Sequence, residues 1–303
     1  NIRVLHANGA APHQWLVPVA RATRLPLLAH LHIDYRRRSR FVCLLHQSTL
    51  LVGVSRQVTE DFLRDGMAAE RTHTIYNGID FSRLERKGDG TLRHYLGIPQ
   101  DAVVITAAGS LIRRKGQDVL IRAFATLVPG RDIHLLIAGE GPDRAGYEAL
   151  TVELGVQSRV HFLGHSGDIS SVYQATDIVA LASRADAFGL VLAEAGYFFI
   201  PAVATAVGGI PEVIEDGVTG LLVPPDDPSA LAQALVRLVD DPEQRRALGR
   251  AAKARTERMF SVERMVANFH DTYERLARLP HDKLGWLGAD LSLGPYLKAI
   301  TGR

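Results

Sequence analysis

The 303-residue sequence contains a single cysteine, Cys43. One thiol excludes any disulfide within the chain and any zinc site built from several cysteines. Such scarcity is typical of proteins from a reducing compartment. We therefore expect a cytoplasmic location, and contact with the periphery of a membrane stays open.

Long hydrophobic runs are also missing. The most apolar segments, such as Ile178–Ala182 and Ala202–Val207, fall far short of the roughly 20 residues that a transmembrane helix requires. The sequence is 47% hydrophobic and 22% charged, as in ordinary globular proteins, and 303 residues are enough for two domains. We therefore interpret the short apolar segments as buried strands.

Net charge is small but unevenly distributed. The first 100 residues carry 14 Lys and Arg against 8 Asp and Glu, whereas the remaining 203 carry 21 against 25. Four arginines of the basic part fall within residues 36–40. Such a run is most often a solvated surface, but it also fits contact with an anionic acceptor or an anionic membrane. Aromatic residues are not interleaved with it, which argues against a nucleic-acid partner.

From residue 101 onward, short apolar segments that end at glycine alternate with amphipathic ones. Val103–Ala108 and Ile133–Ala138 are typical strands, and residues 117–128 between them place apolar side chains on one helical face. Further strands are expected at 160–163, 178–182, 202–205 and 221–223. Continuous apolar strands separated by helices predict a parallel sheet covered on both faces, with its ligand beyond the carboxyl ends of the strands. This is an α/β, Rossmann-like fold.

The first hundred residues predict part of a second α/β domain. Strands are expected at 2–5, 27–31, 50–54 and 74–76, and Ser55 is placed to cap a helix over 56–64. The charged and glycine-rich segment 80–99 is typical of a linker. We therefore expect a first domain with its linker over 1–95, a Rossmann-like domain over 96–260, and a helix and tail over 261–303.

The loop and helix after the strand at 178–182 carry two acids, Asp186 and Glu194. The backbone amides of Phe188, Gly189 and Leu190 open this helix, and free amides at a helix start bind phosphate. Gly189 would let a ligand approach the backbone, and Glu194 can accept hydrogen bonds from ribose hydroxyls. The alternative is that neither acid binds a ligand. In that case Asp186 is an acid in the N-cap region of the helix, and Glu194 is a residue on the helix surface.

A second loop, Gly109–Gly116, also lies between an expected strand and a helix. It concentrates Arg113, Arg114 and Lys115 at the carboxyl end of that strand. These cations form either a solvated loop or a clamp that neutralises a departing diphosphate.

In this order the segments resemble the retaining glycosyltransferases of family 4, which have the GT-B fold of two Rossmann-like domains. The signature of that family is two acids separated by seven residues, the spacing of Asp186 and Glu194. Five other segments resemble family motifs: Gly109-Ser-Leu-x-x-x-Lys115-Gly, Ile137-Ala-Gly-Glu-Gly-Pro142, Phe162-Leu-Gly164, Gly208-Gly-Ile-Pro-Glu212 and Asp216-Gly-Val-Thr-Gly-Leu-Leu-Val223.

The resemblance implies roles by position. Glu194 would hold the ribose, Asp186 would contact hydroxyls of the donor sugar, and Lys115 would hold the diphosphate. The resemblance gives catalytic roles to Asp186, His32 and Lys115, with His32 facing the donor sugar. The other implied donor-binding residues are Ser110, Arg114, Gly139, Gly141, Phe162, Leu163, Phe188, Gly189 and Leu190. It also implies that no metal and no other cofactor is needed, and that a terminal helix over 260–279 returns to the first domain.

Three features depart from the family pattern. Asp186 is one methylene shorter than the usual glutamate, and Ser110 stands where the family generally has arginine. We also expect that the chain lacks the start of the amino-terminal domain, including the Gly-rich loop of such enzymes. Because of these departures, a protein with impaired catalysis stays among the hypotheses.

The leading hypothesis is therefore a retaining, metal-independent hexosyltransferase of glycan biosynthesis, which moves a sugar from a nucleoside-diphosphate sugar to a hydroxyl acceptor. The alternatives are a catalytically impaired module that only binds the sugar nucleotide, and a GT-B nucleotide-sugar epimerase. The motifs do not distinguish UDP, GDP and ADP as the nucleotide of the donor. They do not identify the acceptor either, and the basic first half is compatible with an anionic glycan or a lipid-linked molecule. The amphipathic tail 281–303 has no assigned place.

Overall fold

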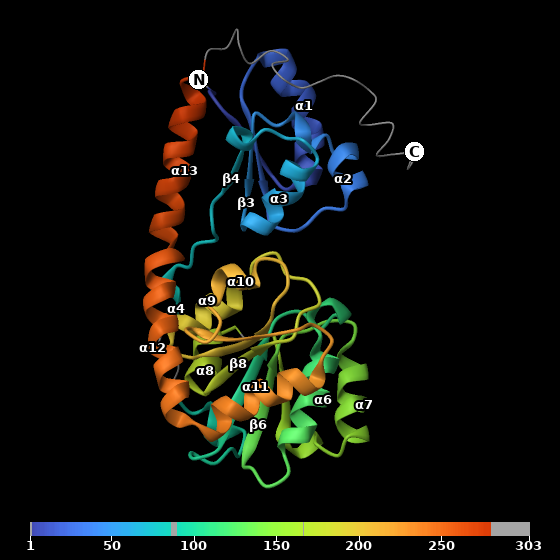
Figure 1. Ribbon diagram of the computed structural model, residues 1–303, viewed down its shortest axis with the longest axis vertical. Helices are drawn as coiled ribbons and strands as arrows, with labels where there is room; N and C mark the ends of the chain where they lie inside the picture. Colours follow the sequence, from blue (N-terminus) through green and yellow to red (C-terminus); the bar gives the residue numbers. More distant parts are fainter. Residues whose placement is uncertain (1, 86–89, 166, 280–303) are drawn as a thin grey trace. The chain divides into compact units, whose positions relative to one another are not determined.

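The computed structural model describes residues 2–85, 90–165 and 167–279 and divides them into two units (Figure 1). Of the described residues, the first unit combines 2–78 with 263–279, and the second lies within Ile79–Val262. Both contain parallel sheets, as the sequence predicts. Within the described residues, no helix has the length and apolar character to cross a membrane.

The sheet of the first unit has the order β1-β2-β3-β4, and all of its strands are parallel. Its strands are β1 (Leu5–Asn8), β2 (Leu27–Leu31), β3 (Leu50–Gly53) and β4 (Thr72–Thr74). Its helices include α1 (Ala10–Thr23), α2 (Arg37–Val42) and α3 (Arg56–Arg64). The oxygen of Ser55 accepts from the amide of Val58, which confirms the predicted cap. The first strand lies later than the predicted 2–5, because its pairing runs from Leu5 opposite Leu27 to Asn8 opposite His30.

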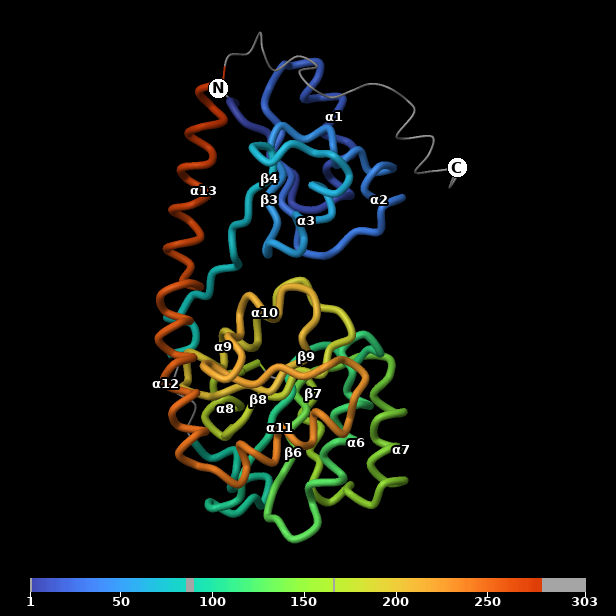
Figure 2. The backbone as a smooth tube through the Cα atoms, viewed as in Figure 1, coloured from blue at the N-terminus to red at the C-terminus, as the bar shows by residue number. Residues whose placement is uncertain are grey.

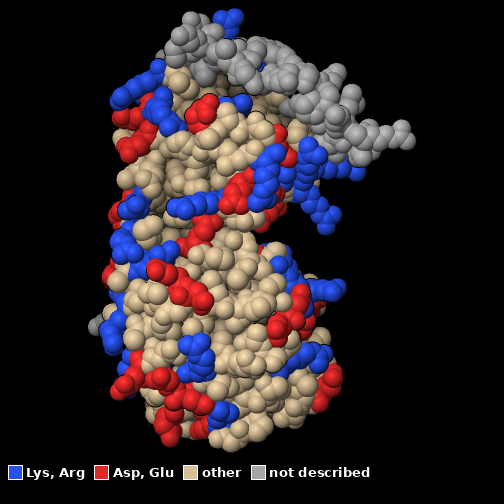
Figure 3. Space-filling view, in the orientation of Figure 1, with Lys and Arg blue, Asp and Glu red and all other residues tan. Residues whose placement is uncertain are grey.

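The arginine run of the first unit is only partly a solvated surface. Arg36, Arg37 and Arg38 are exposed, whereas Arg40 is buried between two carboxylates. Its guanidinium lies 2.7 Å from Asp61 and 2.8 Å from Asp65. Since a buried charge has to be paired, Arg40 serves the fold and is not available to a ligand. Figure 3 shows basic side chains beside acidic ones on its visible face.

Helix α13 (Val262–Ala277) belongs to the first unit for nearly all of its length. Its buried Leu276 packs in a cluster with Leu28 and Leu50 of the sheet, and Phe269 and Tyr273 border that cluster. The terminal helix therefore returns to the first domain, as expected. The tail at 281–303, for which the sequence suggested docking, lies outside the described residues.

The sheet of the second unit has the order β10-β9-β8-β5-β6-β7 and is parallel throughout. Figure 2 labels β6, β7, β8 and β9 of this sheet within the second unit. Its strands are β5 (Val103–Ala108), β6 (Ile133–Ala138), β7 (Val160–Gly164), β8 (Ile178–Leu181), β9 (Ala202–Thr205) and β10 (Gly220–Val223). Each lies where the sequence predicts it, within one residue at either end. The order reverses at β5, which lies between β6 and β8, and open sheets of this kind bind ligands at such a switch point.

Helices cover both faces of this second sheet. Along β5, Ile105 and Ala107 pack into the core shared with α6 (Gln117–Leu127), α7 (Arg144–Glu153) and α11 (Pro228–Asp240). Val104 and Ala108 point to the opposite face, where Ala108 clusters with Val172 of α8 (Ile169–Gln174) and Val104 with Ala175, which follows that helix. Helix α12 (Pro242–Met259) packs against α9 (Leu190–Tyr197). With both faces covered by helices, a ligand of the sheet is expected beyond the carboxyl ends of its strands.

The units divide earlier in the sequence than the expected boundary at residue 95. The segment 80–99, expected as a linker, contains α4 (Phe81–Leu84) and α5 (Leu92–Tyr95) of the second unit. The carbonyl of Leu84 accepts from the hydroxyl of Ser170, and Ile98 packs against Val104. These contacts hold the segment to the second sheet, and nothing in its charged composition indicated them.

Candidate functional site

The loops at the carboxyl ends of the second sheet approach one another very closely. A side chain at Gly139 would lie 2.0 Å from the carbonyl oxygen of Gly109, and one at Gly116 would lie 1.9 Å from that of Ala182. Both glycines also have positive φ, +140° and +67°. Only glycine meets both conditions, so these residues let the loops pack against each other. The loops thereby form one continuous rim at the end of the sheet.

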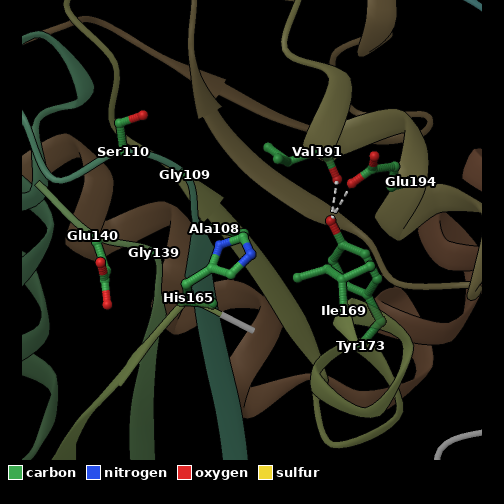
Figure 4. Close-up of a pocket in the computed structure, with 11 residues that line it drawn as sticks. Ala108, Gly109, Ser110, Gly139, Glu140, His165, Ile169, Tyr173, Val191 and Glu194 are labelled. Atoms are coloured by element: carbon green, nitrogen blue, oxygen red, sulfur yellow. Dashed lines mark hydrogen bonds between the residues drawn. The ribbon is translucent and has the colours of Figure 1, made fainter. Parts of the chain in front are cut away.

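A pocket of about 400 Å³ opens inside this rim (Figure 4). It is lined by residues from the ends of β5 and β6, the loop after β7, and helices α8 and α9. These residues are Ala108, Gly109, Ser110, Ala138, Gly139, Glu140, His165, Ile169, Tyr173, Val191 and Glu194. Three residues predicted to bind a donor, Ser110, Gly139 and Glu194, are therefore brought together here. The cavity lies where the strand pattern predicts a ligand.

Glu194 enters the pocket from helix α9. Its Oε2 accepts a hydrogen bond from the hydroxyl of Tyr173 at 2.7 Å, and Figure 4 shows the phenol pointing toward it. Burial raises the pKa of Glu194, and the hydrogen bond from Tyr173 opposes that rise. The sequence predicted Glu194 but missed Tyr173, because nothing in the local pattern around residue 173 links it to a residue 21 positions later.

Asp186, the other predicted acid, is held by protein groups on both of its oxygens. Oδ2 lies 2.6 Å from the ammonium of Lys115. Oδ1 accepts from the amides of Phe188 at 3.3 Å and Gly189 at 3.1 Å. The structure thus joins Asp186 and Lys115, and it gives to Asp186 two of the amides that the sequence assigned to phosphate. Both amides precede helix α9, which begins at Leu190 without a side-chain cap, so Asp186 organises the turn before the helix and does not line the pocket.

The sequence predicts that Gly189 lets a ligand approach the backbone, but the structure gives another explanation for glycine at this position. Its φ is +85°, and a side chain there would meet Leu192 at 3.0 Å and Ile210 at 3.4 Å. The missing Cβ therefore faces apolar side chains of the protein. Leu190, the next residue, begins helix α9 and is 40% exposed.

Arg184 connects the cationic loop to the loop that carries Asp186. Its guanidinium donates two hydrogen bonds to Asp118, at 2.9 and 2.7 Å, and one to the carbonyl of Arg113 at 2.6 Å. The paired carboxylate of Asp118 raises the pKa of Arg184, so the charge is permanent. Arg114 adds a bond of 2.8 Å to the carbonyl of Ala185. Arg184, which the sequence analysis missed, therefore holds the cationic loop against the loop of Asp186. The role of the cationic loop as a diphosphate clamp stays a prediction.

Three residues predicted to line the nucleotide side do not line the pocket. Phe162 packs against the core of the second unit with Arg144 above its ring, and Leu163 packs on the opposite face. A side chain at Gly141 would meet the carbonyl oxygen of Leu111 at 2.2 Å. The physical reason is that strand side chains are committed to the two cores. Residues just beyond the strands line the pocket instead. Of these, Glu140 lies within the predicted segment Gly139–Gly141, and His165 was missed from sequence.

His32, the predicted histidine of the first domain, follows β2 in the first unit. Its Nε2 is 2.5 Å from the side-chain oxygen of Asn8, and its ring centre lies 4.1 Å from that of His30. Burial lowers the pKa of His32, and it lowers that of His30 to about 3. His32 is therefore held neutral and oriented. Its role toward the donor sugar stays a prediction.

No group of three or more His, Cys, Asp or Glu placed to hold a metal ion occurs in the part of the chain that the structure describes. The cations at the rim are side chains of Lys115 and its neighbouring arginines. Whether the reaction proceeds without metal stays a prediction.

Curated relatives carry glycosyltransferase names. D-inositol 3-phosphate glycosyltransferase of Saccharomonospora viridis is 40% identical over 219 residues, which cover 68% of this chain and 50% of the relative. N-acetyl-alpha-D-glucosaminyl L-malate synthase of Bacillus anthracis is 28% identical over 290 residues, covering 92% and 76%. The chain thus spans about half the length of the inositol phosphate glycosyltransferases that it matches.

Solved structures agree on the fold. HepE of Anabaena, solved in complex with UDP, superposes with a TM-score of 0.84 at 26% identity, over 90% of this chain and 79% of that one. The neighbours are GT-B enzymes, which confirms the predicted architecture.

Two family profiles divide the chain between them. The profile described as Glycosyltransferase Family 4 matches residues 1–83, and that of Glycosyl transferases group 1 matches residues 90–255. The second match alone covers more than half of the 303 residues. The chain therefore belongs to the group 1 glycosyl transferases.

Proposed function

We propose that this protein is a retaining glycosyltransferase that moves a hexosyl group from a nucleoside-diphosphate sugar to a hydroxyl acceptor. The observation that carries the proposal is Glu194, whose carboxylate lines a pocket of about 400 Å³ at the switch point of the second sheet. A carboxylate in such a place accepts hydrogen bonds from the hydroxyls of a ribose. The family membership supports the same assignment.

UDP is the nucleotide that we propose first. HepE of Anabaena, 26–27% identical to this chain, was solved with UDP and with UDP-glucose. The pocket itself offers Glu140 and His165 beside Gly139, which are polar groups that a base could contact. GDP and ADP remain the comparison ligands in every test.

We further propose that protein cations stabilise the leaving diphosphate without a metal. Lys115 stands at the rim, and Arg113 and Arg114 are exposed beside it. In the proposed reaction the bond from the sugar to the diphosphate breaks, and the acceptor oxygen bonds to the sugar on the same face. The acceptor proton passes to the departing diphosphate, whose charge Lys115 offsets.

The acceptor is proposed to carry negative charge. The relatives named above are a D-inositol 3-phosphate glycosyltransferase and an N-acetyl-alpha-D-glucosaminyl L-malate synthase. Each of these names refers to an anionic molecule, a phosphate or a malate. In this chain Arg36, Arg37 and Arg38 are exposed on the first unit, although Arg37 also pairs with Asp65 at 3.1 Å. Screening should therefore begin with phosphorylated polyols and small hydroxy acids.

The experiment that tests the proposal is calorimetric titration of the chain with UDP, GDP and ADP, beside the Glu194→Ala variant. We expect one nucleotide to bind and the variant to bind it about 10-fold or more weakly, because a hydrogen bond to a charged group is lost. Equal affinity in the variant would remove Glu194 from the ribose site. Binding by none of the three would contradict the proposed function of this chain.

Turnover then separates the enzyme classes. A transferase releases the nucleoside diphosphate only when an acceptor is present, an epimerase isomerises the donor alone, and an impaired module binds without turnover. His32→Ala should lower turnover while nucleotide affinity stays unchanged. A matched loss of nucleotide affinity in that variant would assign His32 to nucleotide binding instead.

A further inference from the structure

Tyr173 is a buried polar side chain next to the pocket. It lies on α8 and is only 1% exposed. Its hydroxyl donates to Oε2 of Glu194 at 2.7 Å, and the carbonyl oxygen of Val191 is 3.5 Å away. A buried hydroxyl without a partner would cost free energy, and here the partner is the acid of the pocket.

The contact acts on one oxygen of the carboxylate only. Oε2 of Glu194 is taken by Tyr173, and no other hydrogen bond to Glu194 occurs among the contacts of the described residues. Figure 4 shows the phenol below the carboxylate, with both groups at the same side of the cavity. The ring of Tyr173 is itself fixed, since its centre lies 5.3 Å from that of Phe198 and its side chain is enclosed.

We propose that Tyr173 is a positioning residue that holds the Glu194 carboxylate in one orientation, and that this contact lets the pocket distinguish ribose from deoxyribose. The inference rests on the proposed function and names the group that makes its ribose site selective. A glutamate side chain has several rotatable bonds, so a carboxylate without a fixed partner would spread over several orientations. An acceptor aligned in advance binds a hydroxyl with less loss of entropy.

The protonation states of the pair also support this role. Burial raises the pKa of Glu194, whereas the hydrogen bond from Tyr173 lowers it. Burial and the neighbouring carboxylate raise the pKa of Tyr173 well above its usual value, so the phenol keeps its proton and remains the donor. Without the phenol, Glu194 would be protonated at higher pH and would lose acceptor strength.

The chain offers a matched control in Tyr197. Its hydroxyl lies 2.7 Å from the carboxylate of Glu85, the same distance as in the Tyr173 pair. Tyr197 is on α9 as well, but neither it nor Glu85 lines the pocket. Tyr197→Phe therefore removes a phenol–carboxylate hydrogen bond of the same length, at an exposed position outside the proposed site.

The first experiment is titration of the whole chain with UDP and with 2′,3′-dideoxyuridine diphosphate. Wild type should bind UDP at least about 10-fold more tightly than the dideoxy compound, because the ribose hydroxyls contact a charged group. In Tyr173→Phe that ratio should fall to about 2, and in Tyr197→Phe it should stay at the wild-type value. An unchanged ratio in a folded Tyr173→Phe variant would overturn the proposal, and thermal unfolding establishes that both variants are folded.

A second measurement needs no nucleotide. The carboxyl carbon of Glu194, assigned with Glu194→Gln, is followed by NMR as pH is varied. Tyr173→Phe should move its titration to higher pH, and Tyr197→Phe should leave it in place. If none of the nucleotides binds wild type, the proposed function fails while this titration still decides the contact. An unmoved titration would overturn the role of Tyr173 even if UDP binds well.

Discussion

The two acids of the site are held in opposite ways. Glu194 has one neutral partner, the phenol of Tyr173, and its carboxylate faces the pocket. Asp186 has a cationic partner, Lys115, and two backbone amides, and it is absent from the pocket lining. Spacing in sequence presents them as a pair, but in the structure one lines a pocket and the other is bound by groups of the protein.

The different partners of the two acids imply different free-energy costs for a ligand that binds at each of them. A ligand that meets Glu194 finds an acceptor with a fixed partner and nothing to displace. A diphosphate that approaches Lys115 has to compete with Asp186 for the same ammonium at 2.6 Å. We therefore expect ribose recognition to depend on orientation, and diphosphate recognition to depend on the exchange of an ion pair.

The largest effect is expected at Lys115. Replacing it in Lys115→Met should lower kcat/KM about 100-fold or more, because the developing charge of the leaving group loses its fixed cation. Uridine carries no phosphate, so its affinity should stay unchanged if the variant is folded. Lys253→Met is the matched control, since that ammonium lies over the ring of Tyr197 and outside the pocket lining. A mild loss in the first variant, similar to that in the control, would contradict the clamp.

The two acids should respond to neutralisation with opposite signs. Asp186→Asn should bind UDP about 3-fold more tightly, because Lys115 is released from its partner and a negative charge near the diphosphate is removed. Glu194→Gln should bind UDP more weakly. Asp240→Asn serves as the control, because its partner Arg131 forms an exposed pair at the end of α11. Weaker UDP binding in Asp186→Asn would mean that Asp186 contacts the donor after all.

Smaller effects are expected on the thermal stability of variants at the two acids. Because burial raises the pKa of Glu194 in the folded state above its ordinary 4.5, the ionised form is the costly one. Glu194 therefore lowers the free energy of unfolding above its folded pKa, and this loss disappears below the unfolded value. At pH 7.5, Glu194→Gln should raise Tm by about 2 °C, whereas Asp186→Asn should lower it. Thermal unfolding repeated near pH 4 checks the sign, since the gain from Glu194→Gln should vanish there.

The smallest effect is expected from metal removal. If Lys115 supplies the positive charge, a chelator such as EDTA should leave turnover unchanged. A clear loss that added Mg²⁺ or Mn²⁺ restores would contradict the metal-free proposal. The same assay on Lys115→Met is informative, because rescue of that variant by a divalent cation would show that charge alone is required at this end of the site.

Much of the second unit could be predicted from sequence because its signals are local. Strands such as Val103–Ala108 and Ile133–Ala138 are continuous apolar runs, and both are found with the predicted bounds. The first unit was harder to predict, since its edge strands Leu5–Asn8 and Thr72–Thr74 depend on pairing with a neighbour more than on composition. The segment before residue 95 was misplaced for a similar reason, because its contacts are tertiary.

The sequence by itself determined the alternation of strands and helices, the glycines that end the strands, and the two acids with seven residues between them. These features follow from short-range periodicity and from backbone conformations that only certain residues adopt. The partners of the acids were decided by the tertiary structure, because Tyr173 and Glu194 are 21 residues apart and Lys115 and Asp186 are 71 apart. Hydrogen bonds over such separations exist only once the sheet has brought the strand ends together.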